Sequence, residues 1–215
     1  MDLEFLVEHL PALLQATRIT VGLTLATLLI STLLAVPLAI AGLAPGTWVS
    51  RAISLYSALM RSVPTLVILF FVYYGLPQIG LTLPAFTTAL IGLSLSATAY
   101  TLEIFRSGLR AVDIGQIEAA RALGIPGWRI WRSIAFPQAM PIILPTYLSN
   151  ATLVLKGTSV ASIITISELT ATANEIVSTT YQPFEILFAS SVIYILLGGL
   201  MNGAAQLAGR TWRVQ

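Results

Sequence analysis

The chain has no cysteine and little charge: 9% of its 215 residues are Asp, Glu, Lys or Arg, against about 25% in a typical soluble domain. Without cysteine there is no disulfide framework and no thiolate metal site. With so few charges, water cannot solvate most of the surface, and 56% of the residues are hydrophobic. The composition therefore predicts a protein embedded in a lipid bilayer.

Other signals are missing as well. The positive charges, which leave a net charge of +2, form no basic stripe with interleaved aromatics, so we expect no nucleic-acid partner. The sequence has no Walker-type phosphate loop, no catalytic triad and no cluster of metal ligands, and its single histidine, His9, lies in no motif. We therefore expect the chain itself to have no enzyme activity, cofactor or metal.

The N-terminus does not resemble a cleaved signal, because a signal begins with basic residues and this chain opens with Asp2, Glu4 and Glu8. Leucines at helical spacing over residues 2–16 predict a short amphipathic helix that lies on the membrane surface.

Five apolar stretches are long enough to cross a membrane, since about 20 apolar residues in a helix span about 30 Å of hydrocarbon. In lipid every backbone polar group must be bonded internally, and these runs do not alternate as barrel strands do. The sequence thus predicts an all-α integral membrane protein with one domain, 1–215, and five transmembrane helices. Their ranges are about 19–43, 63–79 (preceded by a short helix from Arg51), 85–105, 140–166 and 184–207.

The orientation follows from the positive residues, which stay on the cytoplasmic side. Connections 76–84 and 167–183 contain no Lys or Arg, and the second of them holds Glu168 and Glu175. The pattern predicts a periplasmic N-terminus and a cytoplasmic C-terminus. The arginines that decide it are Arg51 and Arg61 around the first connection, Arg106, Arg110, Arg121, Arg129 and Arg132 between the third and fourth spans, and Arg210 and Arg213 in the tail.

Two pairs of small residues, Ala35–Ala39 and Gly199–Gly203, have the spacing that lets helices approach closely in lipid. We interpret both as packing within one chain, with a seam between two chains as the alternative. No internal repeat is evident, which disfavours an inverted-repeat carrier.

The only sizeable cytoplasmic segment is residues 113–137, and its pattern begins with a short helix. Asp113 can cap that helix, with Gln116 three residues on as in a capping box. Gly124 suits the left-handed position that follows a helix end. Beyond it, Pro126 prevents continuation.

A second helix is expected in this segment from about Trp128 until Pro137. A membrane protein that places its cytoplasmic residues in one compact helical hairpin presents a docking surface.

The hairpin carries a pattern that resembles the EAA loop of ABC-importer permeases. The family pattern is EAA, three residues, Gly, nine residues, Ile, any residue, Leu, Pro. This chain matches it with Leu replaced by Phe; the matching residues are Glu118-Ala119-Ala120, Gly124, Ile134 and Phe136-Pro137.

The resemblance implies that the first helix of the loop is a coupling helix, which enters a cleft of an ATP-binding subunit through Glu118, Ala119, Ala120 and Gly124. Small alanines keep such a helix thin, and Glu118 offers a charged contact. A structural pairing of Glu118 with Arg121, three residues on, is compatible with docking.

The resemblance further implies an ABC type I importer permease-like fold in the bacterial inner membrane and three kinds of protein partner. They are a dimer of ABC ATPase subunits that binds the ATP, a second permease subunit, identical or different, and a periplasmic solute-binding protein. In the family the binding protein docks on the external face, where Glu168 and Glu175 are expected; a solvated acidic loop is the alternative.

Further stretches resemble permeases for polar amino acids of the histidine, glutamine and arginine type. One position departs from them: relatives often have an acid after Lys156, whereas this chain has Gly157, which disfavours a cationic substrate. The stretches are Arg61-Ser62-Val63-Pro64, Ala99-Tyr100 with Glu103 and Arg106, Gly115-Gln116, Pro137-Gln138-Ala139, Asn150, Leu155-Lys156, Thr158-Ser159 and Glu168-Leu169.

Ionisable groups within a span cost at least about 2.5–3.5 kcal/mol, so each is a functional hypothesis. We predict that Lys156, Thr158 and Ser159 line the substrate pathway and meet an amino acid's carboxylate, with Asn150 on a different face of the same span. The alternative is that Lys156 extends to the interface or pairs internally. Glu103, near the cytoplasmic interface, is interpreted as a salt bridge with a nearby arginine.

Together these features predict the permease subunit of an ATP-driven importer of polar amino acids or closely related compounds. The alternatives are a permease of the same fold for another small substrate and a secondary carrier, which would need no coupling loop.

Overall fold

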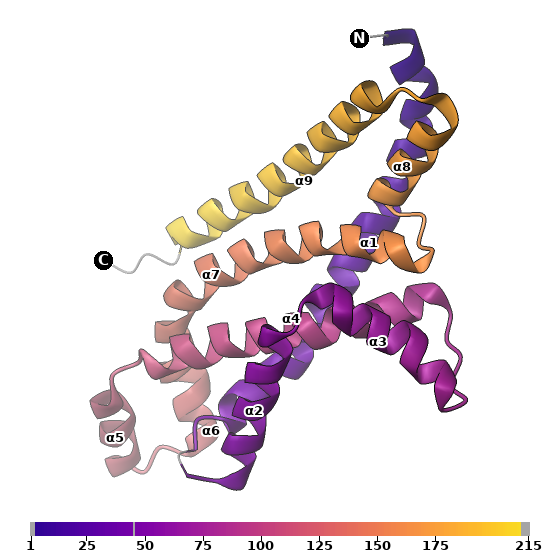
Figure 1. The fold of residues 1–215 in the computed structure, drawn as a ribbon. Helices are drawn as coiled ribbons and strands as arrows, with labels where there is room; N and C mark the ends of the chain where they lie inside the picture. The colour runs from indigo at the N-terminus through magenta and orange to yellow at the C-terminus, as the bar shows by residue number, and fades with distance from the viewer. Residues whose placement is uncertain (1–2, 45, 212–215) are drawn as a thin grey trace.

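The computed structural model describes residues 3–44 and 46–211, and every regular element in them is a helix (Figure 1). Three helices are long and apolar enough to cross a membrane alone, and two bent pairs raise the number of crossings to five if each pair is one span. This agrees with the predicted all-α membrane protein. The elements are α1 (Leu3–Ala41), α2 (Trp48–Ser62), α3 (Thr65–Gln78), α4 (Ala85–Arg110), α5 (Ile114–Ala122), α6 (Gly127–Ile130), the π-helical turn η1 (Trp131–Ala135), α7 (Phe136–Gly157), the 3₁₀ turn η2 (Thr158–Ile164), α8 (Leu169–Thr180) and α9 (Pro183–Thr211).

The separate surface helix expected over residues 2–16 is wrong for the described residues. α1 runs without interruption from Leu3 to Ala41. Leu13 is fully buried in a cluster with Leu169 of α8 and Ile186 of α9. The leucines of this stretch therefore pack partly against other helices of the chain, and the first helix is longer than the predicted span.

The bend between α2 and α3 comes from Pro64. The residue before a proline avoids the helical conformation, and Val63 is extended, with φ −93° and ψ 129°. Pro64 also lacks an N–H to continue the hydrogen bonding of α2, and the two helices are bent by 101°. The second predicted span and its short preceding helix correspond to this pair.

α4 is the central helix and packs against α1, α2, α3 and α7 (Figure 1). Two glycines allow close approach: a Cβ at Gly92 would lie 2.7 Å from Cδ2 of Leu69 in α3, and one at Gly108 would overlap Ile143 of α7. These contacts fix α4 between the helices that line the cavity described below.

The two predicted small-residue pairs behave differently. Ala35 and Ala39 are both fully buried in the cluster around α4, so packing within the chain is confirmed for them. A Cβ at Gly199 or Gly203 would meet nothing within 4 Å. The same interpretation is therefore wrong for the glycine pair, because no other described helix approaches closely at these two positions.

Candidate functional site

The loop that resembles an EAA loop begins with a capped helix, α5. Asp113 is its N-cap, and the Asp113 carboxylate accepts a 2.8 Å hydrogen bond from the N–H of Gly115. The expected cap residue is confirmed, although its side chain binds the N–H of Gly115 rather than that of Gln116. The cap fixes the point at which the chain leaves α4 and turns into α5.

α5 ends as Gly124 predicts. Gly124 has φ +70°, its N–H donates to the carbonyl of Arg121 at 2.9 Å, and the N–H of Ile125 donates to the carbonyl of Ala120 at 3.1 Å. This pair of bonds is the Schellman arrangement, which needs a left-handed residue and therefore favours glycine. The turn after α5 is thus defined by its backbone.

Three of the four predicted coupling residues are on the surface. Glu118, Ala119 and Gly124 are exposed, whereas Ala120 is buried beside Ile117 in the cluster that joins α5 to the ends of the spans. The pairing of Glu118 with Arg121 is absent, since the ion pairs of the described residues all involve Glu103. α5 therefore has an inner apolar face and an outer face free for a partner.

The second helix of the loop does not end at Pro137. α6 continues through the π-helical turn η1 into α7, and the N–H of Phe136 bonds to the carbonyl of Trp131, five residues back. Pro137 lies at the start of α7, directly after the π-helical turn, where a helix has to accommodate its missing N–H. The loop is therefore joined to the fourth span by one bent but unbroken helical path.

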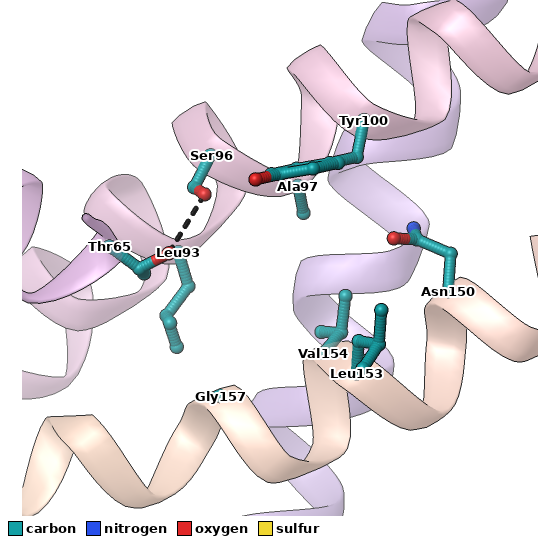
Figure 2. A pocket seen from close by; sticks show the side chains of 9 residues that line it. All are labelled: Thr65, Leu93, Ser96, Ala97, Tyr100, Asn150, Leu153, Val154 and Gly157. Carbon is teal, nitrogen blue, oxygen red and sulfur yellow. Dashed lines mark hydrogen bonds between the residues drawn. The ribbon is translucent and has the colours of Figure 1, made fainter. Parts of the chain in front are cut away.

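A cavity of about 230 Å³ lies between the beginning of α3, the middle of α4 and the second half of α7. We call it the α4–α7 cavity; Figure 2 shows the side chains around it. None of its lining residues is acidic or basic. They are Thr65, Leu93, Ser96, Ala97, Tyr100, Asn150, Leu153, Val154 and Gly157.

Polar groups from three helices meet around this cavity. The hydroxyls of Thr65 and Ser96 lie 3.0 Å apart (Figure 2). The Asn150 amide N–H donates to Oγ1 of Thr101 at 3.5 Å. The hydroxyl of Tyr100 donates to the carbonyl of Arg61 at 3.4 Å. The remaining wall is apolar, so the cavity combines a few placed polar groups with an apolar surface, as small-molecule sites do.

Of the residues predicted for the substrate pathway, Asn150 lines the α4–α7 cavity, together with Gly157. Lys156, Thr158 and Ser159 do not. The Lys156 side chain is exposed, Thr158 is buried with its hydroxyl donating to the carbonyl of Leu155 at 2.7 Å, and the Ser159 hydroxyl donates to the carbonyl of Lys156. The structure thus separates residues that the sequence places within three positions of one another.

Sequence reasoning missed Thr65 and Ser96 as site residues. Tyr100 was noted only as part of a family-like stretch. Thr65 follows Pro64 directly, so its position at the bend of a broken span was the one available signal. Ser96 and Tyr100 lie one helical turn apart on α4, a spacing that apolar helices use for packing as readily as for a site.

Near the predicted cytoplasmic ends of α2 and α4, Glu103 forms the expected salt bridge. Its carboxylate accepts bonds of 2.6 and 3.2 Å from the guanidinium of Arg106, and one of 2.6 Å from the hydroxyl of Ser57. Arg106 in turn donates to Oγ of Ser54 at 2.9 Å. The network ties α4 to α2 through a charge pair that is largely removed from solvent.

Glu168 is not part of a solvated acidic loop: its side chain is fully buried, as the N-cap of α8. One carboxylate oxygen accepts from the N–H of Ala171 at 2.8 Å; the other accepts from the hydroxyls of Thr20 at 3.4 Å and Tyr194 at 3.1 Å. A fully buried side chain can neither face a docking partner nor lie in a solvated loop, so both predictions are wrong for Glu168. Glu175, further along α8, is exposed.

The chain matches the family described as binding-protein-dependent transport system inner membrane component over residues 31–214. One similar curated protein is the nopaline transport system permease protein NocM of Agrobacterium fabrum, which is 38% identical over 97% of this chain and 90% of that protein. Another is the octopine transport system permease protein OccM of Rhizobium meliloti, which is 36% identical over 90% of this chain and 82% of that protein. The crystal structure of an amino acid ABC transporter with histidines superposes with a TM-score of 0.89 and 32% identity, covering 98% of this chain and 99% of that one. The chain therefore belongs to the binding-protein-dependent transport system inner membrane component family, as the permease subunit of an ATP-driven importer whose ATPase is a separate subunit.

Proposed function

We propose that this permease moves polar amino acids or amino-acid derivatives without net positive charge across the inner membrane, through the α4–α7 cavity. The observation that carries the proposal is the lining of that cavity, which is polar at Asn150, Tyr100 and the Thr65–Ser96 pair but has no ionisable acid or base. Its volume of about 230 Å³ is below the roughly 300–1,000 Å³ of drug-sized ligands, which suits a molecule of amino-acid size.

The relatives support a substrate of amino-acid type; others among them are named for histidine, lysine, arginine and ornithine, so the absence of net positive charge rests on the cavity lining alone. Two of them are named for nopaline and octopine, which are amino-acid derivatives, and the similar solved transporter was crystallised with histidines. Gly157 at the cavity wall removes the acid that would attract a cationic side chain. A polar substrate with balanced charges would meet the amide of Asn150 and the hydroxyls opposite it.

Lys156 and Ser159 complete the proposed route at a seam between two permease subunits. A lysine facing lipid would cost about 2.5–3.5 kcal/mol, so an exposed Lys156 without an acidic partner among the described residues favours a polar environment supplied by a second chain. In such a seam its ammonium would meet the substrate carboxylate.

ATP enters the mechanism only through the partner ATPase dimer, so the chain itself needs no cofactor. α5 would insert its exposed face, with Glu118 and Ala119, into the ATPase, and Gly124 would permit the turn behind it. An apolar residue beside this face, Leu123, is 79% exposed and would be covered by the partner. The buried Ala120 would hold α5 to the spans, so that movement of the ATPase moves them.

The proposed orientation follows the arginines: the α5 loop and the C-terminus face the cytoplasm, and the N-terminus faces the periplasm, although Arg213 lies outside the described residues. Exposed Glu175 on α8 would then face the periplasmic binding protein. The buried Glu168 would hold α8 in place beneath it.

Uptake competition tests the proposal. The complete importer, reconstituted in vesicles, would be given one labelled polar amino acid and a panel of unlabelled neutral, acidic and basic competitors. In the wild type we expect neutral polar amino acids or opine-like derivatives to compete. In Asn150→Ala we expect the KM to rise about tenfold, because roughly 1–2 kcal/mol of hydrogen bonding is lost. In Gly157→Asp we expect arginine to compete more strongly than in the wild type. Unchanged selectivity and KM in both variants would place the route elsewhere.

A further inference from the structure

A second cavity, of about 510 Å³, lies where the ends of α1 and α4 meet α5 and η1. We call it the loop cavity. In Figure 1, α5 and α6 lie at the same end of the molecule as the turn from α1 to α2, so this cavity is at one membrane boundary. Its lining residues are Ile40, Leu43, Ala44, Leu109, Arg110, Val112, Ile114, Ile117, Arg121 and Trp131.

Two arginines in this lining, Arg110 and Arg121, form no ion pair with any other described residue. The ion pairs within the described residues join Glu103 to Arg61 and to Arg106, so neither Arg110 nor Arg121 has one. The nearby carboxylate of Asp113 is occupied as the N-cap of α5, and Glu118, three residues from Arg121, is not paired with it. The loop cavity therefore has two guanidinium groups in its lining that no described carboxylate engages in an ion pair.

The rest of the wall is apolar and comes from the ends of two membrane-spanning helices and the residues just after them. Ile40 and Leu109 lie in the last turns of α1 and α4, and Leu43 and Val112 lie two residues beyond the ends of these helices. The half-buried Trp131 closes the side, at the depth where tryptophans prefer the boundary between headgroups and hydrocarbon. A ligand that matches this wall has an anionic head and apolar chains.

We propose that the loop cavity binds one anionic phospholipid, with its phosphate between Arg110 and Arg121 and the upper part of its acyl chains against Ile40, Leu43 and Val112. Basic pockets between transmembrane helices at a membrane face are suited to anionic headgroups, and a guanidinium holds phosphate by paired N–H bonds. The bound lipid fills the gap between α5 and the ends of the spans, beside the buried contacts of Ile117. This proposal depends on the membrane position of the chain and not on its substrate.

Native mass spectrometry of the complete importer, extracted from vesicles of phosphatidylglycerol and phosphatidylcholine, measures the lipids retained. We expect phosphatidylglycerol bound in preference to phosphatidylcholine, and retention lowered about tenfold or more in Arg110→Gln/Arg121→Gln, since each arginine attracts anionic lipid. The matched control Arg129→Gln/Arg132→Gln removes the same charge from exposed positions outside the cavity and should retain lipid as wild type. Arg110→Lys/Arg121→Lys, which keeps the charge, should retain most of it.

Each other result overturns the proposal. Equal retention in wild type and in Arg110→Gln/Arg121→Gln would show that the lipid binds elsewhere. Displacement of the signal by inorganic phosphate alone would identify a soluble anion as the ligand. Loss of the ATPase subunit with unchanged lipid in that double variant would make the two arginines part of the protein interface instead.

Discussion

The hydroxyl of Tyr194 donates a 3.1 Å hydrogen bond to Oε2 of Glu168, and so joins α9 to the residue that caps α8. The same oxygen accepts from Thr20 of α1, while the hydroxyl of Thr20 also accepts a 3.0 Å bond from the N–H of Leu169. One buried carboxylate thus connects three helices on the side of the molecule opposite α5 (Figure 1). A buried polar group of this kind is tolerable only while its partners remain.

Removal of the carboxylate in Glu168→Ala should destabilise the protein by about 2–3 kcal/mol, because it loses a helix cap and leaves buried donors unpaired. Thermal unfolding in detergent measures the effect. Glu175→Ala changes an exposed glutamate on the same helix and should leave the melting temperature within error. Equal melting temperatures for wild type and Glu168→Ala would contradict the structural role given to this residue.

Close packing between α4 and α7 predicts a cost for a single methyl group at Gly108. A Cβ there overlaps the side chain of Ile143, so Gly108→Ala should destabilise by about 1–3 kcal/mol, as overpacked cores do. Gly199→Ala adds the same methyl group where the chain has open space, and helix propensity should favour it. Denaturant-dependent unfolding measures the free energy of unfolding of both variants. A lower value for Gly199→Ala than for Gly108→Ala would contradict the prediction.

The Glu103–Arg106 pair predicts an asymmetric response to substitution. Glu103→Gln leaves the mostly buried guanidinium of Arg106 without a counter-charge, which should cost about 2–3 kcal/mol, less than a fully buried pair because Glu103 is partly solvated. Glu118→Gln, at an exposed position without an ion pair, is the control for stability. The melting temperatures of the two variants test this prediction, and Glu103→Gln should melt at the lower temperature. Equal melting temperatures would mean that solvent replaces the Glu103 carboxylate at no cost.

Lys156 tests whether the route includes a seam between subunits. Lys156→Ala and Lys156→Met both remove the ammonium group, and Met keeps most of the length of the lysine side chain. If the ammonium meets substrate, both variants should lower uptake at equal membrane abundance. Lys156→Arg keeps the charge and should retain part of the activity. Wild-type uptake in the Ala and Met variants would leave Lys156 with only a snorkelling role.

Hydrophobic length and turn residues predicted much of the fold. The ranges of α3, α4 and α9 lie within a few residues of three predicted spans, and both ends of α5 follow from Asp113 and Gly124. Length and composition carry this information because a span needs a fixed number of apolar residues and a helix end needs particular backbone conformations.

The predictions that did not hold concern tertiary contacts. Leucines before residue 17 suit a membrane surface and a helical core equally well, and only their packing against α8 distinguishes the two. From the sequence alone, Glu168 was expected in an acidic loop. Its hydrogen-bond partners Thr20 and Tyr194 are far away in the sequence, so only the structure reveals them. Asn150 and Gly157 line the α4–α7 cavity, whereas Lys156 does not. The sequence could not predict this, because three helices form the cavity and the pattern of one helix does not show which face meets the other two.

The central claim is that α5 transmits movement from an ATPase to the spans, and site-specific cross-linking tests it most directly. The chain has no native cysteine, so Ala119→Cys introduces a unique thiol on the exposed face of α5. In membrane vesicles that contain the complete importer, a short bifunctional thiol reagent should join this position to a cysteine placed in the docking cleft of the ATPase subunit, with a yield that changes when ATP is bound. Labelling of Ala119→Cys by an impermeant reagent from the periplasmic side, or no cross-link to the ATPase, would contradict the account.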